Sequence, residues 1–285
     1  MKNIIKNSIF FILILFVSGC SSTNKDKIEE SGLLLGVQAY TFHKFSFQQA
    51  IDKVNQLGLK YIEAYYGQPL GEAIGEGKFD YKMDKATQQK VLDYAKSRNV
   101  KIMASGVINC NNNDEWKQLF EFAKAMEIEV ITCEPDYNML KYIDELANQF
   151  NIDVAIHNHP KPSLYWTPEL FLEHVEGLSN CIGSCVDIGH FKRMGFDPVE
   201  ALKKYEGRIK SLHFKDIQAK QEGEEEQRDI IWGQGVINLE GVLSELKSQN
   251  FNGLLSIEYE YNWENSVPDI EECIKYFNAE LEKLY

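Results

Sequence analysis

The sequence predicts an α/β protein that folds as a single (β/α)8 TIM barrel. Apolar segments of strand length alternate with amphipathic stretches of helical length, and this alternation implies repeated βα units and a parallel sheet. About 250 residues lie between Leu33 and Tyr285, which is the usual size of one such barrel. Eight expected strands also fit a closed barrel better than an open sheet. We therefore expect one domain over residues 33–285.

The expected strands are short apolar runs that end before a turn or a helix start. They cover 33–40, 60–66, 100–107, 129–135, 153–159, 183–190, 209–216 and 253–260. Helix signals lie between them. Thr167-Pro168 and Asp197-Pro198 each place a proline at the first helical position after a capping side chain. Gly58 is expected to end a helix over 47–57.

The amino terminus carries a targeting pattern. Lys2 and Lys6 precede an apolar stretch over 9–17, which is shorter than the roughly 20 apolar residues that a membrane-spanning helix needs. The following Val-Ser-Gly-Cys20 resembles the bacterial lipobox, in which cleavage precedes a cysteine that becomes lipid-modified. The resemblance implies a lipoprotein signal peptide over 1–19, and a lipidated Cys20 on a flexible tether over 20–32. We expect an extracytoplasmic protein, held to a bacterial membrane by its lipid only and facing the periplasm.

Charge and cysteine content exclude several classes of protein. The formal net charge is −13, and it becomes −15 when residues 1–19, with two lysines and no acids, are removed. Nucleic acid is therefore a poor candidate partner, since its binding depends on positive side chains. Five cysteines remain after Cys20, an odd number without a CxxC pair, which indicates neither a disulfide framework nor a zinc-thiolate site. The acidic segment 218–229 is expected to be an exposed loop.

Successive expected strands end in side chains that bind metals or transfer protons. These residues are Glu134, His157 with His159, Asp187 with His190, His213, and Glu258. The carboxyl ends of the strands form the active face of a (β/α)8 barrel, so these groups are expected to converge. Carboxylates and imidazoles without thiolates favour one divalent ion of the Mn²⁺, Mg²⁺, Co²⁺ or Zn²⁺ type.

Four short motifs carry a family resemblance over essentially the whole expected domain. They are DxGH at 187–190, HxKD at 213–216, WGQG at 232–235 and IEYE at 257–260. With this order and spacing, the chain resembles the xylose isomerase-like barrel superfamily of sugar isomerases, epimerases and apurinic endonucleases. The resemblance implies Asp187, His213 and Glu258 as metal ligands. The family usually supplies a glutamate from strand five, where this chain has His157, so the fourth ligand is Glu134, His157 or both.

The resemblance also implies roles around the metal. The metal-bound glutamates of related epimerases act as acid and base, which extends to Glu258 and Glu134, and His159 is a further candidate base. Four other side chains are expected to contact substrate: Glu63, His190, Lys215 and Trp232. Three structural alternatives stay open. Glu63 could be a rim residue, His157 and His159 could simply hydrogen-bond the loop that follows them, and Lys215 could form an ion pair with Asp216 or Glu258.

The function implied is a metal-dependent isomerase or epimerase acting on a sugar or sugar derivative. It would abstract a proton next to a carbonyl through a metal-stabilised enediolate. One alternative is an extracytoplasmic lyase or hydratase on 3-keto-glycosides, and another is a non-catalytic sugar-binding lipoprotein. The nuclease branch uses extra histidines on early strands, where this chain has Glu63. We expect a small carbohydrate as partner, and whether the chain forms a homo-oligomer is open.

Overall fold

The chain forms a closed barrel of parallel strands in a computed structural model that describes residues 31–223 and 227–285. The barrel strands are β1 (Leu34–Gln38), β2 (Tyr61–Ala64), β5 (Lys101–Ile108), β6 (Val130–Cys133), β7 (Asp153–His157), β8 (Ile182–Asp187), β9 (Ile209–Phe214) and β12 (Leu254–Ile257). Strand β1 closes the ring by pairing in parallel with both β12 and β2. The predicted (β/α)8 barrel is therefore confirmed.

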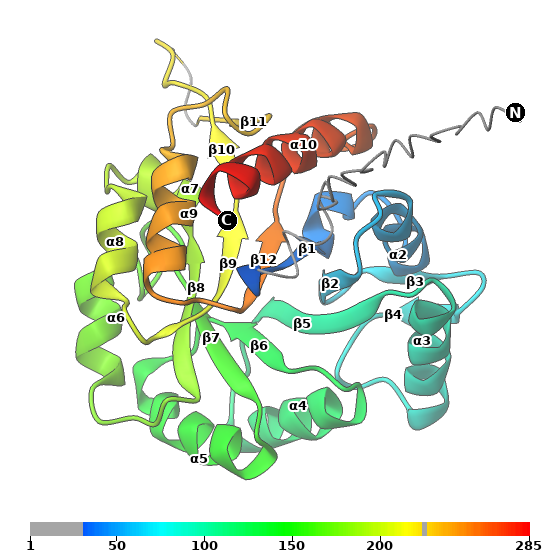
Figure 1. The fold of residues 1–285 in the computed structure, drawn as a ribbon. Helices are drawn as coiled ribbons and strands as arrows, with labels where there is room; N and C mark the ends of the chain where they lie inside the picture. Colours follow the sequence, from blue (N-terminus) through cyan, green and yellow to red (C-terminus); the bar gives the residue numbers. More distant parts are fainter. Residues whose placement is uncertain (1–30, 224–226) are drawn as a thin grey trace, which may run out of the picture.

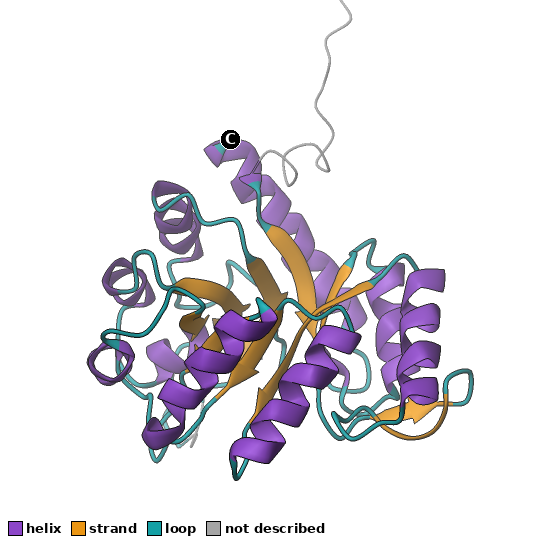
Figure 2. Ribbon diagram, turned by 90° about the horizontal axis from the view of Figure 1, so that it is seen from below, coloured by secondary structure: helices purple, strands orange, loops and turns teal. Residues whose placement is uncertain are grey.

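Helices surround the ring of strands, as Figures 1 and 2 show from two directions. They are α2 (Phe47–Gln56), α3 (Lys85–Ser97), α4 (Asn113–Ala125), α5 (Leu140–Phe150), α6 (Pro168–Val175), α7 (Ile188–Arg193), α8 (Pro198–Lys204), α9 (Leu239–Ser248) and α10 (Val267–Leu284), with 3-10 turns η1 (Ala39–Phe42) and η2 (Tyr137–Met139). Two hairpins extend from the barrel: β3 (Pro69–Gly71) with β4 (Gly75–Lys78), and β10 (Asp216–Ile217) with β11 (Asp229–Ile230).

The helix signals act as their chemistry predicts. The Thr167 side chain accepts a hydrogen bond from the Leu170 N–H at 3.2 Å, and the Asp197 side chain accepts one from Val199 N–H at 2.9 Å. Gly58 follows α2 with a φ of +73°, a conformation that glycine adopts without the strain other residues would meet.

Several expected strands end a few residues earlier than predicted, and two expectations about boundaries are wrong in ways that concern the site. The strand predicted over 183–190 ends at Asp187, because the Asp187 side chain caps α7 and accepts a hydrogen bond from His190 N–H at 2.6 Å. The segment 218–229 is not wholly an exposed loop, since Asp229 is buried and forms an ion pair with Arg193. Burial raises the pKa of Asp229 to about 6, against the opposing effects of Lys215 and Arg193.

The barrel interior changes from apolar to polar towards the carboxyl ends of the strands. A small buried cluster that includes Met103, Ala155 and Leu254 fills the amino-terminal part. Side chains two positions further along face the same way because strand side chains alternate. Hence His157 faces the same way as Ala155, and Ser256 faces the same way as Leu254. The alternation thus places polar side chains towards the carboxyl ends of the strands, next to the apolar cluster.

Several predictions concern segments outside this description. The predicted signal peptide over 1–19, Cys20 and the tether as far as residue 30 lie outside the described residues. In the part of the chain that is described, no helix has the length and apolar character needed to cross a bilayer.

Candidate metal centre

Four neighbouring strands bring four potential metal ligands together. His157 ends β7, Asp187 ends β8, His213 lies on β9 and Glu258 directly follows β12. One nitrogen or oxygen from each lies within 4.8 Å of the others, and all four residues are buried. Three of the four are the ligands implied by the family resemblance, and the fourth member of this group is His157.

A buried carboxylate orients His213. The Nε2 of His213 lies 3.1 Å from Glu63 Oε2, which also accepts a hydrogen bond from Ser256 Oγ at 2.6 Å. Burial alone raises the pKa of Glu63, but the attraction of His213 and these hydrogen bonds lower it below the usual value. A carboxylate can only accept, so Nε2 carries the proton and Nδ1 faces Glu258 Oε2 at 3.1 Å.

Glu134 holds His157 in the same way. The Nδ1 of His157 lies 3.0 Å from Glu134 Oε1, which leaves Nε2 facing Asp187 Oδ2 at 3.6 Å. Burial lowers the pKa of His157, whereas Asp187 and Glu134 raise it more, to about 9. A cation beside Nε2 would displace the proton from that nitrogen, because a histidine that binds a metal is in its neutral form. Carboxylate–histidine–metal arrangements of this kind recur at protein metal sites.

The donor set fits a divalent cation. Among buried atoms, His157 Nε2, Asp187 Oδ2 and His213 Nδ1 all lack a hydrogen bond of acceptable geometry, although polar atoms in protein interiors are normally satisfied. With both histidines neutral, three buried carboxylates, Glu63, Asp187 and Glu258, accompany one buried ammonium. A divalent ion would offset this excess of negative charge, to which the partly exposed Glu134 and Glu260 also contribute.

Lys215 supplies that ammonium from the end of β9. Its Nζ lies 2.7 Å from Glu258 Oε2, 3.0 Å from Asp187 Oδ2 and 2.9 Å from Glu260 Oε1. Burial raises the pKa of Asp187, but the charge of Lys215 and a hydrogen bond from His157 help to lower it more, so the carboxyl stays ionised. Lys215 thus helps to keep the carboxylates of Asp187 and Glu258 in the charged form that could bind a metal.

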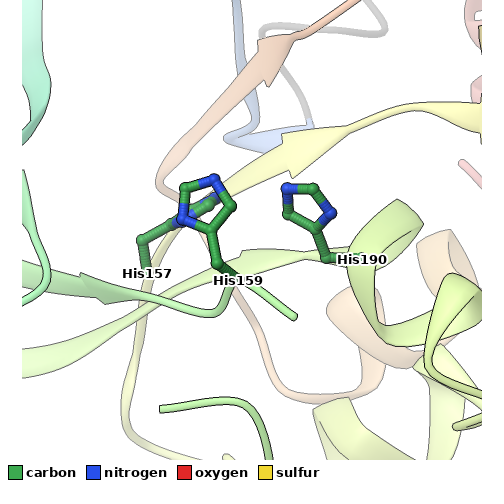
Figure 3. Close-up of side chains that lie close together, drawn as sticks. All are labelled: His157, His159 and His190. Carbon is green, nitrogen blue, oxygen red and sulfur yellow. The ribbon is translucent and has the colours of Figure 1, made fainter. Parts of the chain in front are cut away.

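Two further histidines lie beside the cluster at the barrel mouth (Figure 3). His159 and His190 group with His157, each offering a ring nitrogen within 4.8 Å of the others. The Nδ1 of His159 contacts Glu134 Oε1, and its side chain is 46% exposed. The Nε2 of His190 lies 3.7 Å from Asp187 Oδ2, while burial lowers the pKa of His190 and favours its neutral form.

A cavity of about 290 Å³ opens directly beside these groups, and we call it the inner cavity. Its lining includes His157, His159, His190, Glu258 and Glu260. Glu260 was not among the predicted site residues, although it is two positions from Glu258 in the expected strand over 253–260, where alternation predicts the same facing. That facing was the signal from which the sequence could have identified it.

The remaining predicted residues lie away from this cavity lining. Glu63 is fully buried and turned towards His213. Trp232 packs in the core against Phe214 at 4.7 Å between ring centroids. In the same WGQG segment, the Asp216 carboxylate accepts hydrogen bonds from the N–H groups of Gly233 at 3.0 Å and of Gly235 at 2.9 Å. This motif therefore shapes the loop after β11.

Comparisons with known proteins agree with this architecture. A family model described as xylose isomerase-like TIM barrel matches residues 51–279. An inosose isomerase of Halalkalibacterium halodurans is 24% identical over 250 residues, which cover 78% of this chain and 85% of that protein. An inosose dehydratase of Clostridium perfringens is 28% identical over 164 residues, covering 52% of this chain and 48% of that protein. The chain thus matches about half the length of the dehydratase.

Solved structures show the same barrel. A crystal structure of an uncharacterised protein from Parabacteroides distasonis has a TM-score of 0.71 and 34% identity, and covers 86% of this chain and 98% of that one. The crystal structure of the IOLI protein with a bound zinc atom has a TM-score of 0.69 at 19% identity, and covers 88% and 99%. At that identity, the likeness to the IOLI protein shows the fold alone. From the family match and the closed barrel, the chain belongs to the xylose isomerase-like TIM barrel family.

Proposed function

We propose that this chain is a divalent-metal-dependent isomerase or epimerase that removes a proton next to the carbonyl of a sugar or sugar derivative. The observation that carries the proposal is the convergence of His157, Asp187, His213 and Glu258 at the barrel mouth. A carboxylate contacts one ring nitrogen of each histidine and leaves the other ring nitrogen for a metal, an arrangement suited to metal ligands. The curated inosose isomerase supports an isomerase among the activities of the family.

These four residues would hold the cation. When bound, a divalent cation would draw electron density from a substrate carbonyl and make the neighbouring C–H more acidic. Glu258 lines the inner cavity and is held ionised: burial raises its pKa, but Lys215 and His213 lower it more. An ionised carboxylate in that position is suited to accept the proton from carbon.

His159 is the proposed partner in proton transfer. It reaches the inner cavity from the loop after β7, whereas Glu258 follows β12. Its Nδ1 contacts Glu134, so Glu134 would orient the ring. Ser163 Oγ donates to the other oxygen of Glu134 at 2.8 Å and fixes the carboxylate. Glu134 is thus proposed as a positioning residue behind both His157 and His159.

A lyase is the second candidate, and the inosose dehydratase relatives favour it. Proton removal by the same residues, followed by loss of a group from the adjacent carbon, would give an unsaturated product. The two reactions differ in product mass. An isomerase leaves the mass unchanged, whereas a lyase releases water or an aglycone.

We also propose that the reaction takes place outside the cytoplasm on an unphosphorylated substrate. The lipobox-like segment before Cys20 supports this location. The described residues that line the inner cavity include Glu258 and Glu260 and no lysine or arginine, so its lining offers no such side chain to pair with a phosphate group.

The proposed function can be tested on purified protein beginning at residue 21. Bound metal is measured by mass spectrometry, and the metal-loaded protein is incubated in D₂O with inosose, free sugars and keto-sugars. We expect deuterium at one carbon of one substrate, seen by NMR. Glu258→Gln and His159→Gln should each reduce exchange at least about 100-fold. His174→Gln on α6 is a matched control outside the cluster.

Two results would reject the proposed enzyme. One is the absence of both metal and exchange across the whole panel. The other is sugar binding that persists unchanged after chelation and in Glu258→Gln, which is the behaviour of a non-catalytic binding protein.

A further inference from the structure

A second, larger cavity adjoins the inner cavity. This outer cavity has a volume of about 710 Å³, and its lining includes Lys161, Ser163 and Trp263. Both cavities are lined by His159, His190 and Glu260, so these residues form the boundary between them. A ligand that crosses this boundary would have one part beside the metal cluster and another part in the outer cavity.

An aromatic wall runs along both cavities. Tyr40 and Tyr65 line the inner cavity, and Trp263 lines the outer one. The Tyr40 ring lies edge-on to both neighbours, with centroids 5.0 Å from Tyr65 and 5.7 Å from Trp263. Such rings combine flat apolar faces with polar edges, which suits a sugar, whose rings present C–H faces and a rim of hydroxyls.

The cations around the outer cavity are already engaged. Arg193 forms an ion pair with Asp229, and Arg228 donates to Tyr261 Oη at 2.6 Å and packs over that ring. Lys161 lies 3.8 Å above the ring of Trp166. Of these cations only Arg193 has a carboxylate partner among the described residues, but Glu134 and Glu260 also line the outer cavity. The lining therefore carries both signs of charge, which suits a neutral hydroxylated group better than a phosphate.

The volumes of the two cavities distinguish a substrate of one sugar ring from a larger substrate. At about 290 Å³, the inner cavity is at the small end of the range for small-molecule sites, roughly 300–1,000 Å³. It suits one sugar ring. The outer cavity adds more than twice that volume along the same aromatic wall.

We propose that the outer cavity is a second sugar subsite, and that the substrate is a neutral glycoside of at least two rings. The ring with the carbonyl occupies the inner cavity, and the attached ring lies against Trp263 in the outer cavity. This inference rests on the proposed function, since it assigns the reacting ring to the metal cluster.

The test compares matched ligands on the Mn²⁺-loaded protein. The probes are keto-glucoses with the carbonyl at carbon 2, 3 or 4, each as the single ring and as a disaccharide with a second glucose in α or β linkage. Affinity is measured by titration calorimetry, and deuterium exchange is followed in parallel. For the ring that reacts, we expect the disaccharide to bind about tenfold more tightly than the single ring. In Trp263→Ala this ratio should fall to near one.

Phe251→Ala is the control, because Phe251 is a partly buried aromatic residue that lines a hollow at the opposite end of the barrel. It should leave the ratio unchanged. A ratio near one in the parent protein, with exchange on single rings, would overturn the second subsite and leave the proposed function intact. A high ratio that persists in Trp263→Ala would overturn the assignment to this cavity. Absence of binding and exchange with every probe would reject the proposed function and this inference together.

Discussion

At the scale of single residues, the least predictable feature is the pair of carboxylates behind the histidines. Glu63 and His213 are 150 positions apart, so their contact exists only once the barrel has closed. The sequence identified both as polar groups near strand ends, but not the direction in which Glu63 points. Glu134 was expected as a ligand or acid-base group, and its contacts with His157 and His159 emerge only from the folded chain.

We expect Glu63→Gln to weaken metal binding by roughly 10- to 100-fold, the usual effect of losing the partner of a metal-binding histidine. The neutral amide still accepts a hydrogen bond from His213 Nε2, but it no longer provides a charge that strengthens the imidazole as a donor to the metal. Competition with a fluorescent chelator for Mn²⁺ and Zn²⁺ measures the effect.

Glu280→Gln provides the matched control, because Glu280 is a buried carboxylate on α10 that pairs with Lys283. It should leave metal affinity within about twofold of the parent. Equal affinities for the parent and Glu63→Gln would show that Glu63 has no influence on the metal through His213.

At the scale of elements, all eight strands were predictable because each is a short apolar run with a distinct end. The end of β8 was not predictable, because Ile188 continues the apolar run in the sequence although the backbone already turns into α7 at this residue. Two side chains fix this turn. The Asp187 side chain caps α7, and the Asn158 side chain accepts from Asp187 N–H at 2.8 Å and donates to Asp187 O at 3.0 Å. They keep Asp187 directed at the cluster.

Gly189 in α7 allows close packing against Lys215. A Cβ at this position would lie 2.4 Å from Lys215 Cδ, which real contacts do not permit. Replacing a helical glycine by alanine ordinarily stabilises a protein by about 0.5–1 kcal/mol. We expect the opposite sign for Gly189→Ala, a loss of about 1–3 kcal/mol in the free energy of unfolding, measured by urea denaturation.

A double mutant tests the cause of that loss. In the Lys215→Ala background, the additional cost of Gly189→Ala should largely vanish, because the atoms that clash are gone. An unchanged cost in that background would assign the loss to another contact.

At the scale of the whole molecule, the metal cluster joins strands that are adjacent in the ring. The order β12, β9, β8, β7 places the four potential ligands on one continuous arc of the barrel. A cation bound there would link this arc and stabilise the folded state relative to the unfolded chain. The sequence predicted this arc, because the order of strands in such a barrel follows their order along the chain.

Removing the metal should therefore lower the melting temperature. With free metal at about 100 times its Kd, bound metal contributes about 2.7 kcal/mol, which corresponds to roughly 5–10 °C for a domain of this size. Differential scanning calorimetry after chelation, and again after Mn²⁺ or Zn²⁺ is restored, measures the shift. His157→Gln is the control and should show a much smaller response. Identical melting curves with and without metal would argue against a structural link through the cluster.

Location is a property of the full chain, and the segment ending at Cys20 is its expected determinant. In the bacterial envelope, the parent protein should fractionate with membranes and incorporate labelled fatty acid. Cys20→Ser should abolish the labelling, because serine has no thiol to carry the lipid, while the barrel from residue 33 keeps its fold and melting temperature. Cys181→Ser, at a partly exposed cysteine of the barrel, is the matched control and should leave labelling intact. A parent protein that is never labelled would remove the lipid anchor, and with it the main support for an extracytoplasmic substrate.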